Sequence, residues 1–168
     1  MTGLDDALVV HAPSDREIVL SRLFDAPVDL VFAAFTQPEL LVRWYGARGW
    51  RLAECDVDLR VGGRWRFMSL GPAGARMVQA GVYRQIEPPH RLVYTELFDD
   101  QSYPGETLVG HEFTELAGRT TVTTTLLYAT AEGRDIVLRY PMARGVGQSY
   151  LRLAELLHLT TTTRGEQP

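Results

Sequence analysis

Lysine is missing from this sequence of 168 residues, so arginine supplies all 17 of its basic side chains. Without lysine the chain cannot form a Schiff base with a carbonyl substrate or build the lysine-containing phosphate loop of nucleotide-binding proteins. The single cysteine, Cys55, excludes an internal disulfide and a cysteine-based metal cluster. The four histidines show no metal-ligand spacing, and no G-x-S-x-G elbow is present. We therefore predict no metal and no cofactor.

Long apolar runs are also missing. No stretch approaches the roughly 18 residues of a membrane-spanning helix, and the chain does not begin like a signal peptide, so we expect no membrane span and a cytoplasmic location. The net charge is −4 and the arginines are scattered among acids, so we expect no nucleic-acid partner. The length suits one domain, at residues 15–159, between flexible segments at 1–14 and 160–168.

The apolar pattern changes its period along the chain. It predicts a first strand at 16–24, a helix that starts at Pro27, and a second short helix from Pro38 to about Trp44. Alternation then predicts six strands bounded by turn residues, at 53–60, 63–70, 76–87, 91–98, 107–116 and 119–128. A short apolar piece at 135–140 precedes a long helical stripe from Met142 to Leu157. This order predicts an α+β fold, with a seven-stranded curved antiparallel sheet wrapped on a long C-terminal helix.

The stretch LRVGGRWRF at 59–67 has two interpretations, a phosphate-binding loop or the turn of a β-hairpin. Because no lysine and no helical pattern follow the glycines, we favour the turn. Alternation then places Arg64 and Arg66 on the outer face of the strand, and Trp65 and Phe67 on the inner face.

Five strings together carry a resemblance to a known family. They are FDAPVDLVFAAFTQPELLVRWYG at 24–46, DLRVGGRWRF at 58–67, GVYRQIEPPHRLVYTE at 81–96, GRTTVTTTLLY at 118–128 and MARGVGQSYLRLAELL at 142–157. In this order they resemble the SRPBCC superfamily, which has the helix-grip or START-like fold. Within it, the chain is most similar to the domain named for the activator of heat-shock protein 90 ATPase.

The resemblance implies a fold with a cavity between sheet and helix, and it leaves three functions open. The first is binding of a small hydrophobic molecule, such as a polyketide-like or lipid-like one. The second is an enzyme of the polyketide cyclase, dehydratase or hydrolase type that uses the same cavity. The third is a protein-interaction module like the chaperone activators. The resemblance also implies pairing as a homodimer.

Alternation indicates which side chains would line such a cavity if the apolar-richer faces point inward. From the strands we expect Trp65, Phe67, Tyr94, Phe98, Thr124 and Tyr128, and from the helix Met142, Val146 and Tyr150. Tyr45 and Trp50, which follow the second helix, are expected to contact or gate a ligand at one mouth, as in related domains. For Trp44 we favour packing of the short helix against the sheet.

Glu96 and His111 are the candidate catalytic residues. Glu96 alternates with Tyr94 and Phe98, and burial among them would raise the pKa of its carboxyl group toward the range useful for proton transfer. A register shifted by one residue would instead turn Glu96 to water. His111 is either a core histidine bonded to a neighbour or a partner of Glu96 on the adjacent strand.

Overall fold

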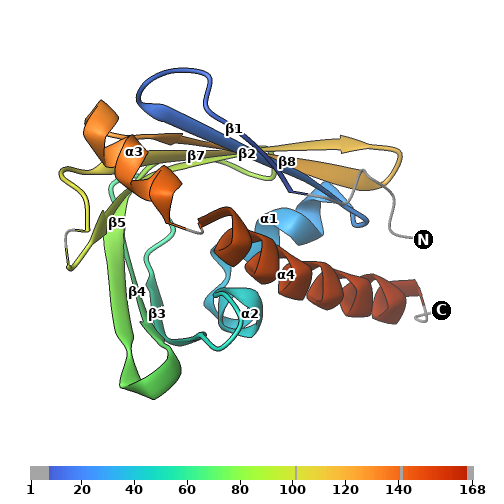
Figure 1. The fold of residues 1–168 in the computed structure, drawn as a ribbon. Coiled ribbons are helices and arrows are strands. Elements are labelled where there is room, and N and C mark those ends of the chain that lie inside the picture. The colour runs from blue at the N-terminus through green and yellow to red at the C-terminus, as the bar shows by residue number, and fades with distance from the viewer. Residues whose placement is uncertain (1–7, 101, 141, 166–168) are drawn as a thin grey trace.

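An eight-stranded antiparallel sheet bends around a long C-terminal helix in the computed structural model, which describes residues 8–100, 102–140 and 142–165 (Figure 1). The helices are α1 (Val28–Thr36), α2 (Pro38–Trp44), α3 (Ala131–Arg139) and α4 (Met142–Gly165). The strands are β1 (Val9–His11), β2 (Glu17–Phe24), β3 (Arg51–Val57), β4 (Arg64–Leu70), β5 (Arg76–Glu87), β6 (Arg91–Phe98), β7 (Thr107–Leu116) and β8 (Arg119–Leu127).

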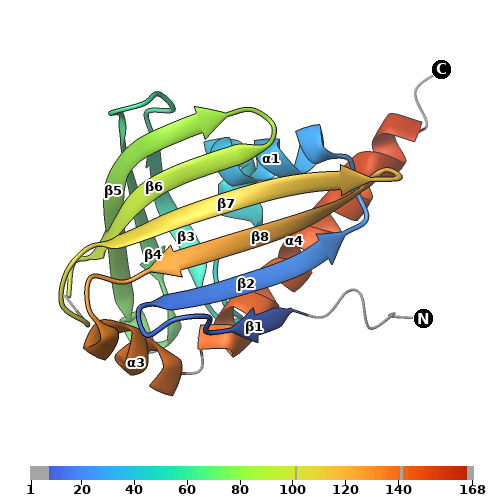
Figure 2. The same cartoon turned by 90° about the horizontal axis from the view of Figure 1, so that it is seen from above.

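The strands from β3 to β8 follow one another as a meander, and β2 pairs with β8, which gives the order β1-β2-β8-β7-β6-β5-β4-β3 (Figure 2). This confirms the predicted α+β fold with a curved antiparallel sheet and a C-terminal helix. Among the described residues, no helix has both the length and the apolar character that crossing a membrane requires.

The predicted count of seven strands is wrong by one. The additional strand, β1, pairs with β2 so that Val10 lies opposite Leu20. Its three residues are too few to show a period, and they lie in the segment that was predicted to be flexible. At the other end, α4 runs on to Gly165, into the predicted tail. Residues 1–7 and 166–168 of these predicted flexible segments lie outside the described residues.

The two glycines of LRVGGRWRF form the turn between β3 and β4. Gly62 has φ +84°, and a Cβ on Gly63 would lie 2.1 Å from the carbonyl oxygen of Asp58. The N–H of Gly62 donates to the carbonyl of Tyr83 (2.8 Å), and the N–H of Tyr83 donates to the carbonyl of Gly63 (2.9 Å). The turn is therefore fastened to β5, and only a residue without a side chain fits at Gly63.

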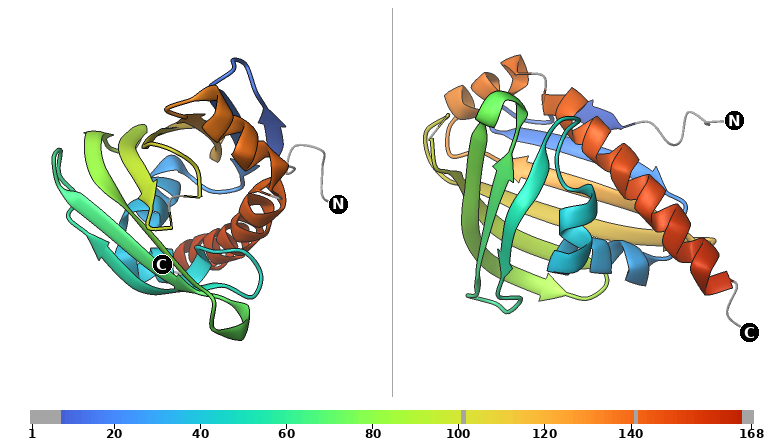
Figure 3. Two further views of the ribbon diagram at one scale, coloured as in Figure 1. Left: turned by 60° about the vertical axis from the view of Figure 1, so that its left-hand side comes forward. Right: turned by 90° about the horizontal axis from the view of Figure 1, so that it is seen from below.

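The hydrophobic core fills one end of the space between the sheet and α4. Along the second half of α4, Leu153, Leu156 and Leu157 are buried. Short helices α1 and α2 close this end, and the ring of Phe35 lies 5.0 Å from that of Trp44. Figure 3 shows the sheet curling around α4 from both sides. The first half of α4 faces a part of the sheet that side chains do not fill, and there the candidate site lies.

Candidate functional site

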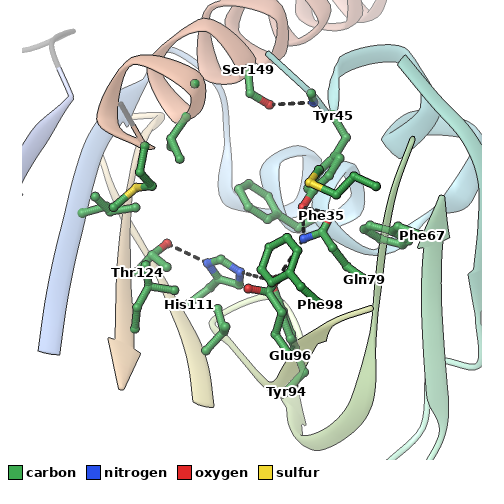
Figure 4. A pocket seen from close by; sticks show the side chains of 18 of the residues that line it. Phe35, Tyr45, Phe67, Gln79, Tyr94, Glu96, Phe98, His111, Thr124 and Ser149 are labelled. Atoms are coloured by element: carbon green, nitrogen blue, oxygen red, sulfur yellow. Dashed lines mark hydrogen bonds between the residues drawn. The ribbon is translucent and has the colours of Figure 1, made fainter. Parts of the chain in front are cut away.

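A cavity of about 410 Å³ lies between the concave face of the sheet and the first half of α4 (Figure 4). Its wall is mainly aromatic and aliphatic. The structure brings twelve of the predicted site residues to it, namely Tyr45, Trp65, Phe67, Tyr94, Glu96, Phe98, His111, Thr124, Tyr128, Met142, Val146 and Tyr150. Residues that lie more than 100 positions apart in the sequence therefore share one surface.

Trp50 is the predicted site residue that the structure places elsewhere. Its ring lies over Gly71, where a Cβ would come within 2.6 Å of it, and it is not part of the cavity wall. The loop that carries it is held to α4, since the N–H of Gly46 donates to Ser149 Oγ (3.1 Å) and Arg152 donates to the carbonyl of Gly46 (3.0 Å). The prediction that Trp50 contacts or gates a ligand is not supported by this position.

Trp44 is a buried packing residue, as predicted, but its ring meets those of Phe35 on α1 (5.0 Å) and Tyr150 on α4 (6.1 Å), where packing against the sheet was predicted. Its indole N–H donates to the carbonyl of Ala34 (2.9 Å), and only 2% of the residue is exposed. Trp44 also contributes to the cavity wall. The next residue, Tyr45, turns its hydroxyl into the cavity, so the last residue of α2 packs the core and the residue after it contributes to the site.

Glu96 points into the cavity because β6 adopts the inward register for Tyr94, Glu96 and Phe98. Its Oε2 accepts a hydrogen bond from Gln79 Nε2 on β5 (3.1 Å). The Gln79 amide also meets the Tyr45 hydroxyl, at 3.1 Å from Oε1 and 2.9 Å from Nε2. Glu96, Gln79 and Tyr45 thus form a connected polar group, which we call the acidic triad, in an otherwise apolar wall (Figure 4).

Burial dominates the chemistry of the triad. Loss of solvation raises the pKa of the Glu96 carboxyl to about 7, although the hydrogen bond from Gln79 pulls it in the opposite direction. Burial, and then the charge of Glu96, raise the pKa of the Tyr45 hydroxyl. A carboxyl that titrates near neutral pH can accept or give a proton, or hold a cation, depending on what occupies the cavity.

His111 belongs to a second polar chain, which runs across three neighbouring strands from Tyr94 on β6 to Thr124 on β8. Its Nε2 lies 2.9 Å from the Tyr94 hydroxyl and its Nδ1 lies 2.7 Å from Thr124 Oγ1. Thr124 also lies close enough to the Tyr150 hydroxyl to lower its pKa, against the larger opposite effect of burial. Burial lowers the pKa of His111 to about 3, so the imidazole is neutral and uses one nitrogen as donor and the other as acceptor.

The predicted pairing of Glu96 with His111 does not form. In the β6–β7 register Glu96 lies opposite Thr107, whereas His111 lies opposite Leu92, four residues away along β6. Each side chain has its own partners, Gln79 for Glu96, and Tyr94 with Thr124 for His111. Sequential strands brought both residues to one cavity, but the register separated them.

Gln79 is the most important residue that sequence reasoning missed. It is 3% exposed and sits on the same face of β5 as Met77 and Tyr83, which also reach the cavity. Assigning the faces of β5 by alternation would have found all three. Tyr103 also lines the cavity, but it lies in the irregular segment before β7, where no periodicity indicates direction.

Metal binding finds no support in the part of the chain that the structure describes. No group of three or more His, Cys, Asp and Glu side chains is placed to hold an ion there. The cavity wall is apolar with a few fixed polar groups, and small-molecule sites in general have this composition.

Comparison with known proteins places this geometry in a family. Residues 25–158 match the family described as Activator of Hsp90 ATPase homolog 1-like protein. A crystal structure of a protein from Rhodobacter sphaeroides is 34% identical, with a TM-score of 0.86, over 92% of this chain and 99% of that one. No curated protein matches the chain.

Two further solved structures are more distant and show the fold alone. A protein from Silicibacter pomeroyi that carries the family's name is 23% identical, with a TM-score of 0.72, over 86% of this chain and 99% of that one. An HSP90 activator from Plasmodium falciparum is also 23% identical, with a TM-score of 0.56, over 74% of this chain and 84% of that one. Because the family match spans both short helices, the whole meander and most of α4, the resemblance seen in the sequence is confirmed, and the chain belongs to the Activator of Hsp90 ATPase homolog 1-like protein family.

Proposed function

We propose that this protein binds a small, mainly apolar or aromatic molecule in the cavity between the sheet and α4. Membership of the family supports a ligand-binding or activator-type function in general. The observation that favours ligand binding is the cavity itself, which a fold that needed only stability would fill with side chains. Its volume lies within the range of roughly 300–1,000 Å³ that is typical of small-molecule sites.

The wall has the composition of a binding site. Rings pack edge-on against one another, with Tyr45 and Phe67 at 5.1 Å and Trp65 and Tyr94 at 5.2 Å between centroids. Such a wall offers a flat or aliphatic ligand a large apolar contact area. The acidic triad and the His111 chain add polar groups at two fixed points, which would orient the ligand.

Filling the cavity tests this proposal. We predict that Val146→Trp, on the cavity face of α4, weakens binding of the uncharged fluorescent probe N-phenylnaphthylamine at least about tenfold, because the indole would occupy the ligand's volume. Fluorescence titration measures the affinity. The control is Leu151→Trp on the same helix, where the side chain is 57% exposed.

The milder Val146→Phe serves if the tryptophan variant does not fold, as judged by circular dichroism. Equal affinities in the cavity variant and the Leu151→Trp control, or no binding to the unmodified protein, would contradict ligand binding in the cavity.

An enzyme that uses the same cavity is the second candidate. The observation that favours it is Glu96, whose carboxyl faces the cavity with a pKa of about 7. Turnover of a bound compound that is lost in Glu96→Gln while affinity is kept would support an enzyme of the cyclase, dehydratase or hydrolase type. An effect on affinity alone would support a binding protein.

An activator-type role is the third candidate, carried by the outer surface rather than the cavity. Its support is the family match and the fold shared with the Plasmodium falciparum HSP90 activator. Stimulation of a chaperone's ATPase by Val146→Trp as well as by the unmodified protein would favour it, because that variant leaves the outer surface intact.

A further inference from the structure

The ionisable groups of the cavity wall give it negative charge without a positive counterpart. Among the described residues that line it, Glu96 is the one acidic side chain, and neither arginine nor lysine is present. His111 does not offset the carboxylate, since burial keeps the imidazole neutral and both ring nitrogens are already bonded, to Tyr94 and Thr124. An ionised Glu96 therefore has no cationic partner in this wall, and a buried carboxylate is costly without one.

The hydrogen bonds around Glu96 present an acceptor to the cavity. Gln79 Nε2 donates to Oε2, so the triad already stabilises that oxygen as an acceptor. The other oxygen, Oε1, accepts no hydrogen bond from the described part of the chain, and it is not sealed from the cavity. The group that completes this site is a hydrogen-bond donor, and a charged donor does so best.

Aromatic residues lie near the Glu96 carboxylate. Tyr45, Tyr94 and Tyr103 are all close enough to Glu96 for its charge to raise the pKa values of their hydroxyls further above what burial alone causes. Figure 4 shows Phe98 beside Glu96 on the same wall. Rings of this kind attract a cation through their faces, so they reinforce a carboxylate in selecting a positively charged group.

Resting on the proposed function, we propose that the ligand of this cavity is an apolar molecule with a basic amine, whose ammonium group bonds to Glu96 Oε1 while its hydrocarbon or aromatic part fills the rest of the cavity. This names a chemical class that the cavity's size and apolar wall alone would not select. It also gives the acidic triad a role without requiring catalysis.

Three indole compounds of one skeleton test the proposal, namely tryptamine, tryptophol and indolepropionate, which end in an ammonium, a hydroxyl and a carboxylate. At pH 8 we expect isothermal titration calorimetry to show tryptamine binding about tenfold tighter than tryptophol, with indolepropionate the weakest. Glu96→Gln should erase the preference for tryptamine and leave the affinity for tryptophol within about threefold. The control is Glu155→Gln, which makes the same chemical change at an exposed position of α4.

The dependence on pH adds a second readout. The amine stays protonated from pH 5 to 9. Burial holds the pKa of His111 at about 3. It also raises the pKa values of the tyrosine hydroxyls near Glu96, which belong to Tyr45 after α2, Tyr94 on β6, Tyr103 before β7 and Tyr128 after β8. Tryptamine binding should therefore weaken as pH falls below about 7 and release a proton there, while tryptophol binding stays level.

The outcomes separate this inference from the proposed function. Equal affinity for tryptamine and tryptophol, or tighter binding of tryptophol, would overturn the amine proposal and leave ligand binding intact. Failure of tryptamine to displace N-phenylnaphthylamine that does bind would have the same meaning. If neither the indoles nor N-phenylnaphthylamine bind, the proposed function itself is contradicted.

Discussion

Burial acts on Glu96 and His111 in opposite directions, because one is charged when it loses a proton and the other when it gains one. The pKa of Glu96 rises from 4.5 to about 7 and that of His111 falls from 6.5 to about 3. Both groups are therefore favoured as neutral in the folded protein. The unfolded chain ionises Glu96 above about pH 4.5 and protonates His111 below about pH 6.5. Burial of Glu96 therefore costs stability as pH rises from about 4.5 to 7, and burial of His111 costs stability as pH falls from about 6.5 to 3.

Glu96→Gln should make the protein more stable at alkaline pH. Because the folded pKa of Glu96 is raised, its contribution to stability is fully present below about pH 4.5 and is lost as pH rises through about 7. Glutamine does not ionise, so the variant does not lose this stability. The difference in the free energy of unfolding between the variant and the unmodified protein should therefore grow from pH 5 to pH 8, to at most about 3 kcal/mol. Urea unfolding at the two pH values measures the free energy of unfolding.

Glu155→Gln is the matched control, since Glu155 is exposed. An advantage of Glu96→Gln that is the same at pH 5 and pH 8 would show that the Glu96 carboxyl is not perturbed by burial.

The turn between β3 and β4 shows, for a single element, how two glycines differ. Gly62 supplies a positive φ, whereas Gly63 supplies room for the approach of the Asp58 carbonyl and bonding to Tyr83. Because Trp65 and Phe67 follow directly on β4, the turn also positions one wall of the cavity.

Gly63→Ala should destabilise the protein by about 2 kcal/mol or more, because its Cβ would meet the Asp58 backbone at 2.1 Å, and backbone cannot move aside cheaply. Gly147→Ala is the control in α4, where nothing lies within 4 Å of a new Cβ. It should be neutral or stabilise the helix by up to about 1 kcal/mol. Thermal unfolding compares the two, and a Gly63→Ala variant as stable as the parent would refute the close approach.

In the molecule as a whole, the position of a strand in the sheet should set how stable it is against local opening. Strands β7 and β8 have neighbours on both sides, while β1 and β3 form the two edges of the sheet. Strands β5 and β6 shift register between Tyr83 and Gln85, beside the cavity wall, and a bulge of this kind bends the strand that carries it. Curvature of this kind lets one sheet both pack the core and leave space under the first half of α4.

Amide hydrogen exchange should follow this order. We expect the amides of β7 and β8 to exchange at least about tenfold more slowly than those of β1, because edge strands open by local fraying rather than by unfolding of the sheet. Mass spectrometry of peptides from the exchanged protein measures the difference. Protection of β1 equal to that of β7 would mean that the short strand is an integral part of the cooperative unit.

Local patterns predicted most elements because alternation and helical spacing depend only on neighbours in sequence. The bounds of β5, β6 and β7 agree with the predictions to the residue, since turn residues border each of them. β1 escaped prediction because three residues cannot display a period, and the extension of α4 through Thr160 to Thr163 escaped because threonine is a poor helix former. There, hydroxyls bond to carbonyls of the preceding turn.

Spacing along the chain was enough to predict the order of the elements, the family and which side chains share a face, because these depend on residues close in sequence. What those side chains contact depends on how the chain folds. The register between β6 and β7 gives Glu96 and His111 separate partners. Packing of the loop after α2 places Trp50 against Gly71 and Tyr45 in the cavity wall. Such choices depend on residues distant in sequence, and on the curvature that leaves space beneath α4, which no local pattern encodes.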